Sequence, residues 1–316
     1  MNNKISVLIP VLNEQSNITE IYVAVKEVLK SFRENIYEII FIDDGSTDAT
    51  LKIIKGIAEE DSAVLFISFS RNFGKDKALS AGICKSKGAA VITIDSDLQH
   101  PPRLIKELIV QWKAGYDVVY YYRKNRTGHI LSISHFFSTV FYKTLNAFAD
   151  VKLEGGISDF RIMDRKVVDV LAKMNEENIF FRGLVKWIGY KQLGLEYTPI
   201  KRNNGKSRYK KTMLLSLAIN SITSFSVKPL TFAIYLGFLF SCLSLLYLPY
   251  AIFSKLHGIA ISGWASTIVT IAFFGGLNLL ILGIVGLYLG KTFMQGKGRP
   301  LYLINESNIE CDNKNI

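Results

Sequence analysis

The stretch YEIIFIDDGSTDAT, Tyr37–Thr50, carries three signals that together decide the fold. Its first seven residues form an apolar run of the length and content typical of a buried strand. The polar residues Asp43–Asp48 follow, and after them Ile53, Ile54 and Ile57 mark the inward face of a predicted helix. A buried strand, a polar loop and an amphipathic helix in this order form the repeating unit of a parallel sheet.

The same alternation of strand and helix signals extends through the first 122 residues. Apolar runs predict four further strands, at Ile5–Val11, Ala63–Phe69, Ala90–Ser96 and Tyr116–Tyr122. Asn17 with Glu20 three residues later forms a capping pattern for a helix after the first strand, and Pro101-Pro102 predicts the first turn of another. We therefore expect an α/β fold, with a mostly parallel sheet covered by helices on both faces.

Two acidic clusters lie at the ends of predicted strands. Asp43-Asp44 closes the second strand, and Asp95-Ser96-Asp97 closes the fourth. Ligands of such sheets bind beyond the carboxyl ends of the strands. Mg²⁺ and Mn²⁺ prefer oxygen ligands and commonly bind through one or two carboxylates plus substrate phosphates. A lone D-x-D is usually a solvated loop, but its position beside a second acidic cluster predicts a site for a divalent cation and a nucleotide.

The composition excludes several classes of protein. Hydrophobic residues make up 49% of the 316 residues, which excludes a disordered polar or acidic chain. Three cysteines are too few for a disulfide-stapled secreted scaffold. The net charge of +11 is compatible with nucleic acid, anionic lipid or phosphorylated substrates. Nucleic acid is not expected as a partner, because the basic residues cluster beside apolar runs without an aromatic stacking motif.

Two long uncharged runs, Leu230–Phe253 and Ala265–Gly290, predict membrane spans, because each is long enough to cross a hydrocarbon layer of about 30 Å. Lys and Arg residues flank both runs on their outer sides, whereas the connecting loop holds only Lys255. The positive-inside rule then places both termini in the cytoplasm. The expected organisation is a catalytic domain over 1–209, a juxtamembrane amphipathic helix over 210–228, spans over 229–253 and 265–290 joined by an external loop over 254–264, and a cytoplasmic tail over 291–316.

Three other segments carry weaker signals. His129–Phe148 and Lys210–Val227 are apolar and aromatic, and each fits either a helix in the membrane interface or a core helix. The interface is favoured for the second, because it runs into the first predicted span. The polar tail beyond Ile304 is expected to be frayed.

The chain resembles the family 2 glycosyltransferases. The resemblance rests on seven motifs in the family's order and covers residues 4 to about 303. The branch that it resembles most is the polyprenyl-phosphate hexosyltransferases, which include bactoprenol glucosyltransferases and dolichol-phosphate mannose synthases. The motifs are SVLIPVLNE (Ser6–Glu14), DDGSTDAT (Asp43–Thr50), SRNFGKDKAL (Ser70–Leu79), DSDLQHPP (Asp95–Pro102), SDFRIMDR (Ser158–Arg165), RGLVKWIG (Arg182–Gly189) and RNNGKSRY (Arg202–Tyr209).

The resemblance implies a GT-A nucleotide-sugar-binding domain and a role for particular residues. The uracil and ribose would be contacted by Pro10, Asn13, Glu14 and Asp43 or Asp44. Asp95 and Asp97 would hold Mg²⁺ or Mn²⁺, with Asp97 in direct contact and Gln99 near the sugar or metal. Asp159 would face the acceptor, and Arg202 would reach the diphosphate. Lys206, Ser207 and Arg208 continue the Arg202 loop, and Arg123 and Arg126 would hold the lipid phosphate.

This chain departs from the family pattern at two positions. His100 stands where the family often has Asp, and the expectation is a surface histidine at a helix start, with a place beside the metal as the alternative. Arg208 stands where the family often has Lys, which keeps the charge but changes the donor geometry.

The implied reaction is an inverting, metal-dependent transfer of a hexose to a polyprenyl phosphate at the cytoplasmic face of a bacterial inner membrane. UDP-glucose is the expected donor, with N-acetylglucosamine, galactose and mannose as open alternatives, and O-antigen or cell-envelope modification is the expected use. The phosphate acceptor is already largely anionic at neutral pH, so Asp159 is as well suited to orienting a substrate as to acting as a base. The expected partners are the bilayer and further copies of the chain, with a tetramer as the assembly that the resemblance implies.

Other functions differ from this one in identifiable ways. A processive polysaccharide synthase would carry a Q-x-x-R-W motif, which this sequence lacks. A transferase with a soluble or protein acceptor would not need paired spans, and a non-catalytic membrane scaffold would not need to retain both acidic clusters.

Overall fold

In the computed structural model, the described residues form an eight-stranded sheet of order β7-β5-β6-β4-β1-β2-β3-β8. The structure describes residues 4–32, 36–123, 157–174, 176–177, 179–197, 227–257 and 263–309. The strands are β1 Ile5–Val11, β2 Tyr37–Asp43, β3 Val64–Phe69, β4 Ala90–Thr93, β5 Val118–Arg123, β6 Ile157–Asp164, β7 Gln192–Tyr197 and β8 Ile304–Ser307. The helices are α1 Ile18–Lys30, α2 Thr50–Glu60, α3 Lys75–Lys85, the 3₁₀ helix η1 Pro102–Leu104, α4 Ile105–Lys113, α6 Arg165–Lys173, α7 Phe181–Trp187, α9 Lys228–Leu256 and α10 Trp264–Gly296.

The middle of the sheet is parallel. In β1, Ile5 lies opposite Tyr37 of β2 on one side and Ala90 of β4 on the other, and β3 continues the parallel set beside β2. β6 runs antiparallel between β4 and β5, and β7 is parallel to β5. The mostly parallel sheet and the α/β fold are therefore as predicted.

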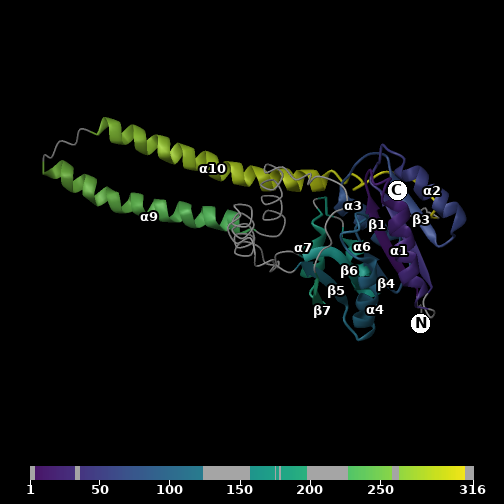
Figure 1. Ribbon diagram of the computed structural model, residues 1–316. Helices are drawn as coiled ribbons and strands as arrows, with labels where there is room; N and C mark the ends of the chain where they lie inside the picture. The colour runs from purple at the N-terminus through teal and green to yellow at the C-terminus, as the bar shows by residue number, and fades with distance from the viewer. Residues whose placement is uncertain are drawn as a thin grey trace. The chain divides into compact units, whose positions relative to one another are not determined.

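Helices cover both faces of the parallel strands, as predicted. On one face, alternate strand residues such as Ile9 and Phe41 pack in a single core with the buried residues of α1, α2 and α4. On the other face α3 lies so close that a Cβ added at Gly82 would be 3.0 Å from side-chain atoms of Leu8 and Ile42. α6 packs beside α3 (Figure 1). The strands are apolar on both sides because both sides are covered.

Most predicted boundaries hold to within a few residues. β1 and β2 have the predicted bounds, whereas β4 ends at Thr93 and not at Ser96. The last contact of this segment with β1 is the Ile94 N–H bond to the carbonyl of Leu8. Asp95 and Asp97 consequently lie in the loop that leaves the sheet.

The capping pattern locates the start of α1 correctly, but the side-chain cap that it predicts is not formed. Asn17 holds the N-cap position with no side-chain cap bond, and its amide donates to Glu14 Oε2 at 2.6 Å. The carbonyl of Glu14 accepts from the N–H groups of Asn17 and Ile18, at 2.8 and 3.3 Å. The Asn17 side chain therefore bonds back to the turn that starts at Glu14 and not to the first turn of α1.

The prediction of a frayed tail beyond Ile304 is also wrong for residues 304–309. β8 pairs antiparallel with β3, and Tyr302 stacks on Phe69 with ring centroids 5.0 Å apart. Asn308 accepts from the Phe66 N–H at 2.7 Å and donates to the Val64 carbonyl at 3.2 Å. The tail is polar because it forms an edge strand: its backbone pairs on one side only and its side chains meet solvent.

The two longest helices, α9 and α10, form a second compact unit, whereas the chain from Pro300 onward belongs to the unit of the sheet. Phe240 of α9 contacts Phe273 and Phe274 of α10, with ring centroids 5.6 and 5.4 Å apart. Among the described residues one helix is long and apolar enough to cross a membrane, over Phe273–Gly296, and Lys228–Phe240 forms a shorter apolar stretch. The first predicted span, over 229–253, stays a prediction.

Replacing Asn308 with Ala should weaken the attachment of β8. The variant loses two side-chain hydrogen bonds to the β3 backbone, so the free energy of unfolding of the sheet unit should fall by about 1–2 kcal/mol. Hydrogen exchange of the Phe66 amide should be faster than in the wild type. Asn305→Ala, an exposed change in the same strand, is the control and should leave this amide protected. Equal exchange in the two variants would contradict the attachment.

Candidate active site

The loops that follow β1, β2 and β4 meet at one edge of the sheet, and most of the predicted site residues lie there. Pro10 is buried in β1 opposite Ile42. β2 ends at Asp43, and the Asp44 N–H donates to the carbonyl of Val11, so the ends of β1 and β2 are joined. The predicted convergence of the acidic loops follows from the parallel pairing of these strands.

The loop after β2 is organised by two buried carboxylates. Asp43 accepts from the Ser46 N–H at 3.0 Å and from the Ser68 hydroxyl at 2.9 Å. Asp44 accepts from the N–H groups of Phe73 and Gly74, at 2.7 and 2.9 Å. Burial raises the pKa of Asp44, and these backbone bonds offset only part of that effect. Both carboxylates thus bond to the protein and fix the neighbouring loops.

A glycine permits the close approach of the two loops. Gly45 has φ +74°, and a Cβ there would lie 2.5 Å from the backbone carbonyl carbon of Arg71. Any other residue would need both a left-handed backbone and a displaced loop. Gly45 therefore brings the Arg71–Gly74 segment, which leads into α3, against the end of β2.

The loop after β1 is bonded to the same structure. Asn13, at φ 54°, donates its N–H to Ser46 Oγ at 2.9 Å and accepts from the Thr47 N–H at 2.8 Å. The Glu14 N–H donates to Thr50 Oγ1 at 2.9 Å. A non-glycine residue in the left-handed region is held by its surroundings, often at functional sites. The two loops form one structured rim.

The D-x-D loop presents two half-buried carboxylates. Asp95 Oδ1 lies 2.5 Å from Lys75 Nζ, and Asp97 accepts from the Gln99 N–H at 3.2 Å. Leu98, which follows Asp97, has φ 56° and is a second non-glycine residue in the left-handed region at this edge. Among the described residues no three His, Cys, Asp or Glu side chains gather as a complete metal site. Two carboxylates suit a cation that takes its remaining ligands from phosphates and water.

The expectation that His100 lies on the surface is wrong. Its side chain is buried, with Nε2 3.0 Å from Ser158 Oγ and 3.7 Å from Asp95 Oδ2. The ring packs against Phe160 and Tyr197, with centroids 5.5 and 5.0 Å away. β6 follows a long segment that gave no strand prediction, so the sequence alone did not show which residues would cover His100.

The most strongly paired group at this edge is Asp159 of β6, which is 4% exposed. Arg182 of α7 grips it with two hydrogen bonds of 2.7 Å, from Nε to Oδ1 and from Nη2 to Oδ2. Lys75 of α3 reaches Oδ2 at 2.7 Å, and the buried Arg161 lies 3.7 Å from Oδ1. One carboxylate therefore joins three elements through cations.

This pairing sets the charge states. Burial alone would raise the pKa of Asp159, but Lys75 and Arg182 outweigh it and hold that pKa well below its usual range. Burial likewise opposes the charge of Lys75, and Asp95 and Asp159 outweigh it and raise the pKa of Lys75. Asp76 differs, because burial and the nearby Asp159 charge raise its pKa to about 6. Asp159 is thus ionised and paired, a poor state for a proton acceptor.

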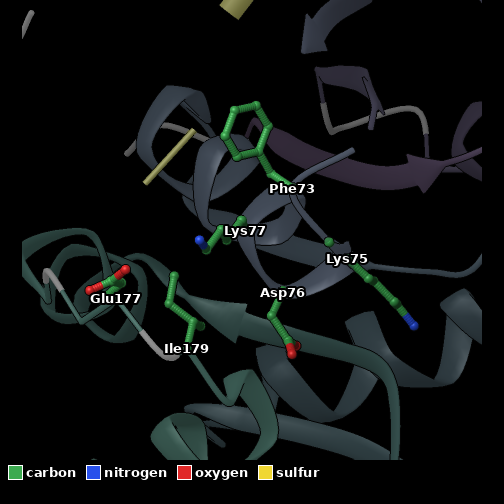
Figure 2. Close-up of a pocket in the computed structure, with 7 residues that line it drawn as sticks. Phe73, Lys75, Asp76, Lys77, Glu177 and Ile179 are labelled. Atoms are coloured by element: carbon green, nitrogen blue, oxygen red, sulfur yellow. The ribbon is translucent and has the colours of Figure 1, made fainter. Parts of the chain in front are cut away.

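Lys75, Arg161 and Arg182 lie within the family motifs, but the sequence alone predicted no role for them. Their chemistry appears only when β6 and α7 are placed beside α3. A pocket of about 200 Å³ borders the cluster, lined by Phe73, Gly74, Lys75, Asp76, Lys77, Glu177 and Ile179. Figure 2 shows Lys75 extending away from Lys77, whose side chain points toward Glu177.

Several predicted site residues cannot be placed in this geometry. Arg123 is the last residue of β5, and its side chain is outside the described part of the chain. Five other predicted site residues lie outside the described residues: Arg126, Arg202, Lys206, Ser207 and Arg208. The apolar segments His129–Phe148 and 210–226 also lie outside them. Their roles remain predictions.

Replacing Asp159 with Asn should destabilise the sheet unit. The variant leaves Lys75, Arg161 and Arg182 without their shared anion, so the free energy of unfolding should fall by about 2–3 kcal/mol. The loss is no larger because water screens the half-exposed Lys75 and Arg182. The control Asp169→Asn removes an exposed ion pair with Arg165 and should change the free energy of unfolding by about 0.3 kcal/mol.

The pH dependence of that difference tests the ion pairing. A carboxylate with a depressed folded pKa stabilises the fold above its unfolded pKa, and this stability is lost as the pH falls toward the folded value. Because Asp76 titrates near pH 6 and its pKa depends on the Asp159 charge, both proteins are compared in an Asp76→Asn background. There the gap between Asp159 and Asp159→Asn should stay constant from about pH 5 to 8 and shrink only below about pH 4, measured by denaturant unfolding. A gap that closes near pH 6–7 would show that Asp159 is not held ionised.

Comparison with known proteins agrees with this arrangement of motifs. The family model described as Glycosyl transferase family 2 matches residues 6–171. The chain is 41% identical to the uncharacterized glycosyltransferase YkcC of Bacillus subtilis (strain 168), over 96% of this chain and 93% of that protein. It is 39% identical to the prophage bactoprenol glucosyl transferase homolog of Escherichia coli (strain K12), over 95% and 98%. It is 38% identical to the bactoprenol glucosyl transferase of Shigella phage SfV, over 95% and 98%. The GT-A fold expected from the motifs is thus the fold observed, and the chain belongs to glycosyl transferase family 2.

Proposed function

We propose that the protein transfers a hexose from a nucleotide diphosphate, best UDP-glucose, to a polyprenyl phosphate such as undecaprenyl phosphate. The observation that carries the proposal is the convergence of Asp95, Asp97 and Asp159 with Lys75 and Arg182 at the carboxyl edge of the sheet. The relatives named bactoprenol glucosyl transferase, similar over nearly their whole length, support the lipid acceptor and the glucose. N-acetylglucosamine, galactose and mannose are the alternative sugars. The proposed product is a lipid-linked sugar that serves as a donor for O-antigen or cell-envelope modification.

The nucleotide part of the donor is assigned to the rim formed by the loops after β1 and β2. Asn13 and Glu14 lie on this rim beside Ser46 and Thr47. Asp43 and Asp44 lie behind it, where their hydrogen bonds hold the rim in place. We therefore assign Asn13 and Glu14 direct contacts with uridine, and Pro10, Asp43 and Asp44 the support of that surface.

The D-x-D residues suit Mg²⁺ or Mn²⁺. Asp95 and Asp97, in the loop after β4, supply carboxylate oxygens, the donor atoms that both ions prefer. When bound, the cation would neutralise the departing diphosphate. Gln99, whose N–H bonds Asp97, shapes the same loop and is assigned to the sugar side of the site.

Asp159 acts through the cations that it holds. The acceptor phosphate has a second pKa of about 6 and is largely anionic at cytoplasmic pH, so it attacks the sugar without losing a proton to the protein. The paired carboxylate orients Lys75 and Arg182 beside the D-x-D loop. In a site where two phosphates must approach each other, fixed cations lower the barrier by stabilising the charge of both.

The remaining predicted residues, five basic side chains and Ser207, are proposed to complete the site. Arg202 and Lys206 are assigned to the diphosphate of the donor. The lipid phosphate is assigned to Arg123, Arg126, Ser207 and Arg208.

The position of β8 supports the proposed two-span topology. Because β7, which precedes α9, and β8, which follows α10, belong to one sheet, both lie on the same side of any bilayer. The chain therefore crosses an even number of times. If the apolar part of α10 crosses, a second segment crosses too, and the uncharged run Leu230–Phe253 in α9 is the candidate.

The proposed location is the bacterial cytoplasmic membrane, with the sheet unit and both termini inside. Lys291, Lys297 and Arg299 follow the second run, whereas the connecting loop holds only Lys255. Two spans enclose little lipid, so association of several copies, with a tetramer as first candidate, is part of the proposal.

Replacing Asp97 with Asn should abolish transfer while leaving the protein in the membrane, because a neutral amide binds a divalent cation poorly. The assay is chloroform-extractable label from membranes given 14C-labelled UDP-glucose, undecaprenyl phosphate and Mg²⁺. The surface control Asp169→Asn should retain activity. Full activity of Asp97→Asn would overturn the metal assignment. Wild-type label that stays water-soluble or protein-bound would favour another acceptor, and no transfer with any of a panel of nucleotide sugars would favour a scaffold.

The topology is tested with single cysteines in a chain whose native cysteines are replaced by Ser. In spheroplasts, a membrane-impermeant maleimide should label Lys255→Cys directly and Arg299→Cys only after permeabilisation, because one position lies outside and the other inside. Labelling of both positions, or of neither, before permeabilisation would contradict the two-span arrangement.

A further inference from the structure

The Lys75 ammonium contacts the carboxylate that the proposed metal would use. Its Nζ lies 2.5 Å from Asp95 Oδ1 and 2.7 Å from Asp159 Oδ2. Asp95 lies in the loop after β4 with 26% of its side chain exposed, whereas the Asp159 side chain is 5% exposed. Lys75 therefore bridges an inner carboxylate and an outer one.

The two halves of this bridge are not equivalent. Asp159 is already gripped by Arg182 through two hydrogen bonds, so a cation remains on it whichever way Lys75 moves. Among the contacts in the described part of the chain, Lys75 is the one cation placed within 3 Å of Asp95, with His100 at 3.7 Å. In the described part of the chain, the contact with Lys75 therefore offsets the charge of Asp95.

The backbone of Lys75 is fixed while its side chain can move. Asp44 binds the N–H groups of Phe73 and Gly74 immediately before it, and Lys75 is the first residue of α3. Its four-carbon stem is flexible and its side chain is 40% exposed. The ammonium can thus leave Asp95 by rotation of the side chain, with no change in the fold.

A divalent cation and an ammonium that contact the same carboxylate lie close together and repel each other strongly. We propose that Lys75 is a positioning residue that exchanges with the divalent cation at Asp95. Without donor, Lys75 occupies Asp95 and keeps the metal weakly bound. When the metal and the nucleotide diphosphate arrive together, Lys75 moves off Asp95, stays on Asp159 and turns toward the phosphates. This inference rests on the proposed function, and it makes metal binding depend on the donor.

Mn²⁺ binding to the full-length protein in detergent tests the exchange without any transfer reaction. The probe is Mn²⁺ alone, with the free ion followed by electron paramagnetic resonance. Lys75→Gln should bind Mn²⁺ at least about tenfold more tightly than the wild type, because its competing charge is gone. With saturating UDP present the advantage should disappear, since the diphosphate then holds the wild-type lysine away from Asp95.

Two variants separate this effect from other causes. Lys85→Gln removes the same charge from the last turn of α3, about 15 Å along the helix, and should bind Mn²⁺ like the wild type. Lys75→Met should behave like Lys75→Gln, and thermal unfolding checks that both variants are folded. Lys75 variants that bind Mn²⁺ no better than the wild type, or not at all, would overturn the exchange. If wild-type membranes form no lipid-linked sugar while the Mn²⁺ result holds, the proposed function fails and the exchange stands.

Discussion

A buried carboxylate has to be matched by cations, and at Asp159 this requirement organises the site. The carboxylate comes from β6, its cations come from α3 and α7, and the backbone carbonyl of the same residue accepts the hydroxyl of Thr93 in β4. Removing a charge from water is costly unless partners replace the water. The elements that supply those partners are therefore held together at the edge where the parallel strands end. The same pairing makes Asp159 an anchor for cations, which suits a reaction between two phosphates.

Most of the sheet could be predicted because its strands are buried on both faces and read as continuous apolar runs. β1 and β2 illustrate this, since their bounds follow directly from the runs that end at Val11 and Asp43. The parallel order then brought the acidic loops to one edge, as expected. The start of α1 followed from the sequence as well, but not its capping, because the Asn17 side chain bonds Glu14 and not the first turn of the helix.

The parts that could not be predicted depend on contacts between distant segments. His100 is polar and sits before a helix, yet Ser158, Phe160 and Tyr197 bury it. The tail after Ile304 is polar in composition, yet its backbone finds the free edge of β3. Lys75 and Arg182 were visible in motifs, but their shared partner is defined only by the position of β6. Composition and periodicity report which face of an element is buried, and they do not report which distant segment buries it.

After α10 the chain returns to the sheet unit and pairs with β3. Under the proposed topology, this return would hold the sheet unit at the surface of the bilayer. The acceptor lipid phosphate is confined to that surface, so tethering raises its effective concentration near the site. The account requires the phosphate itself to displace the nucleotide in one step. Mass spectrometry and proton NMR of the chloroform-extracted product test this most directly. The account predicts a polyprenyl monophosphate that carries a β-linked hexose, and an α-linked hexose, or a product with two phosphates, would contradict it.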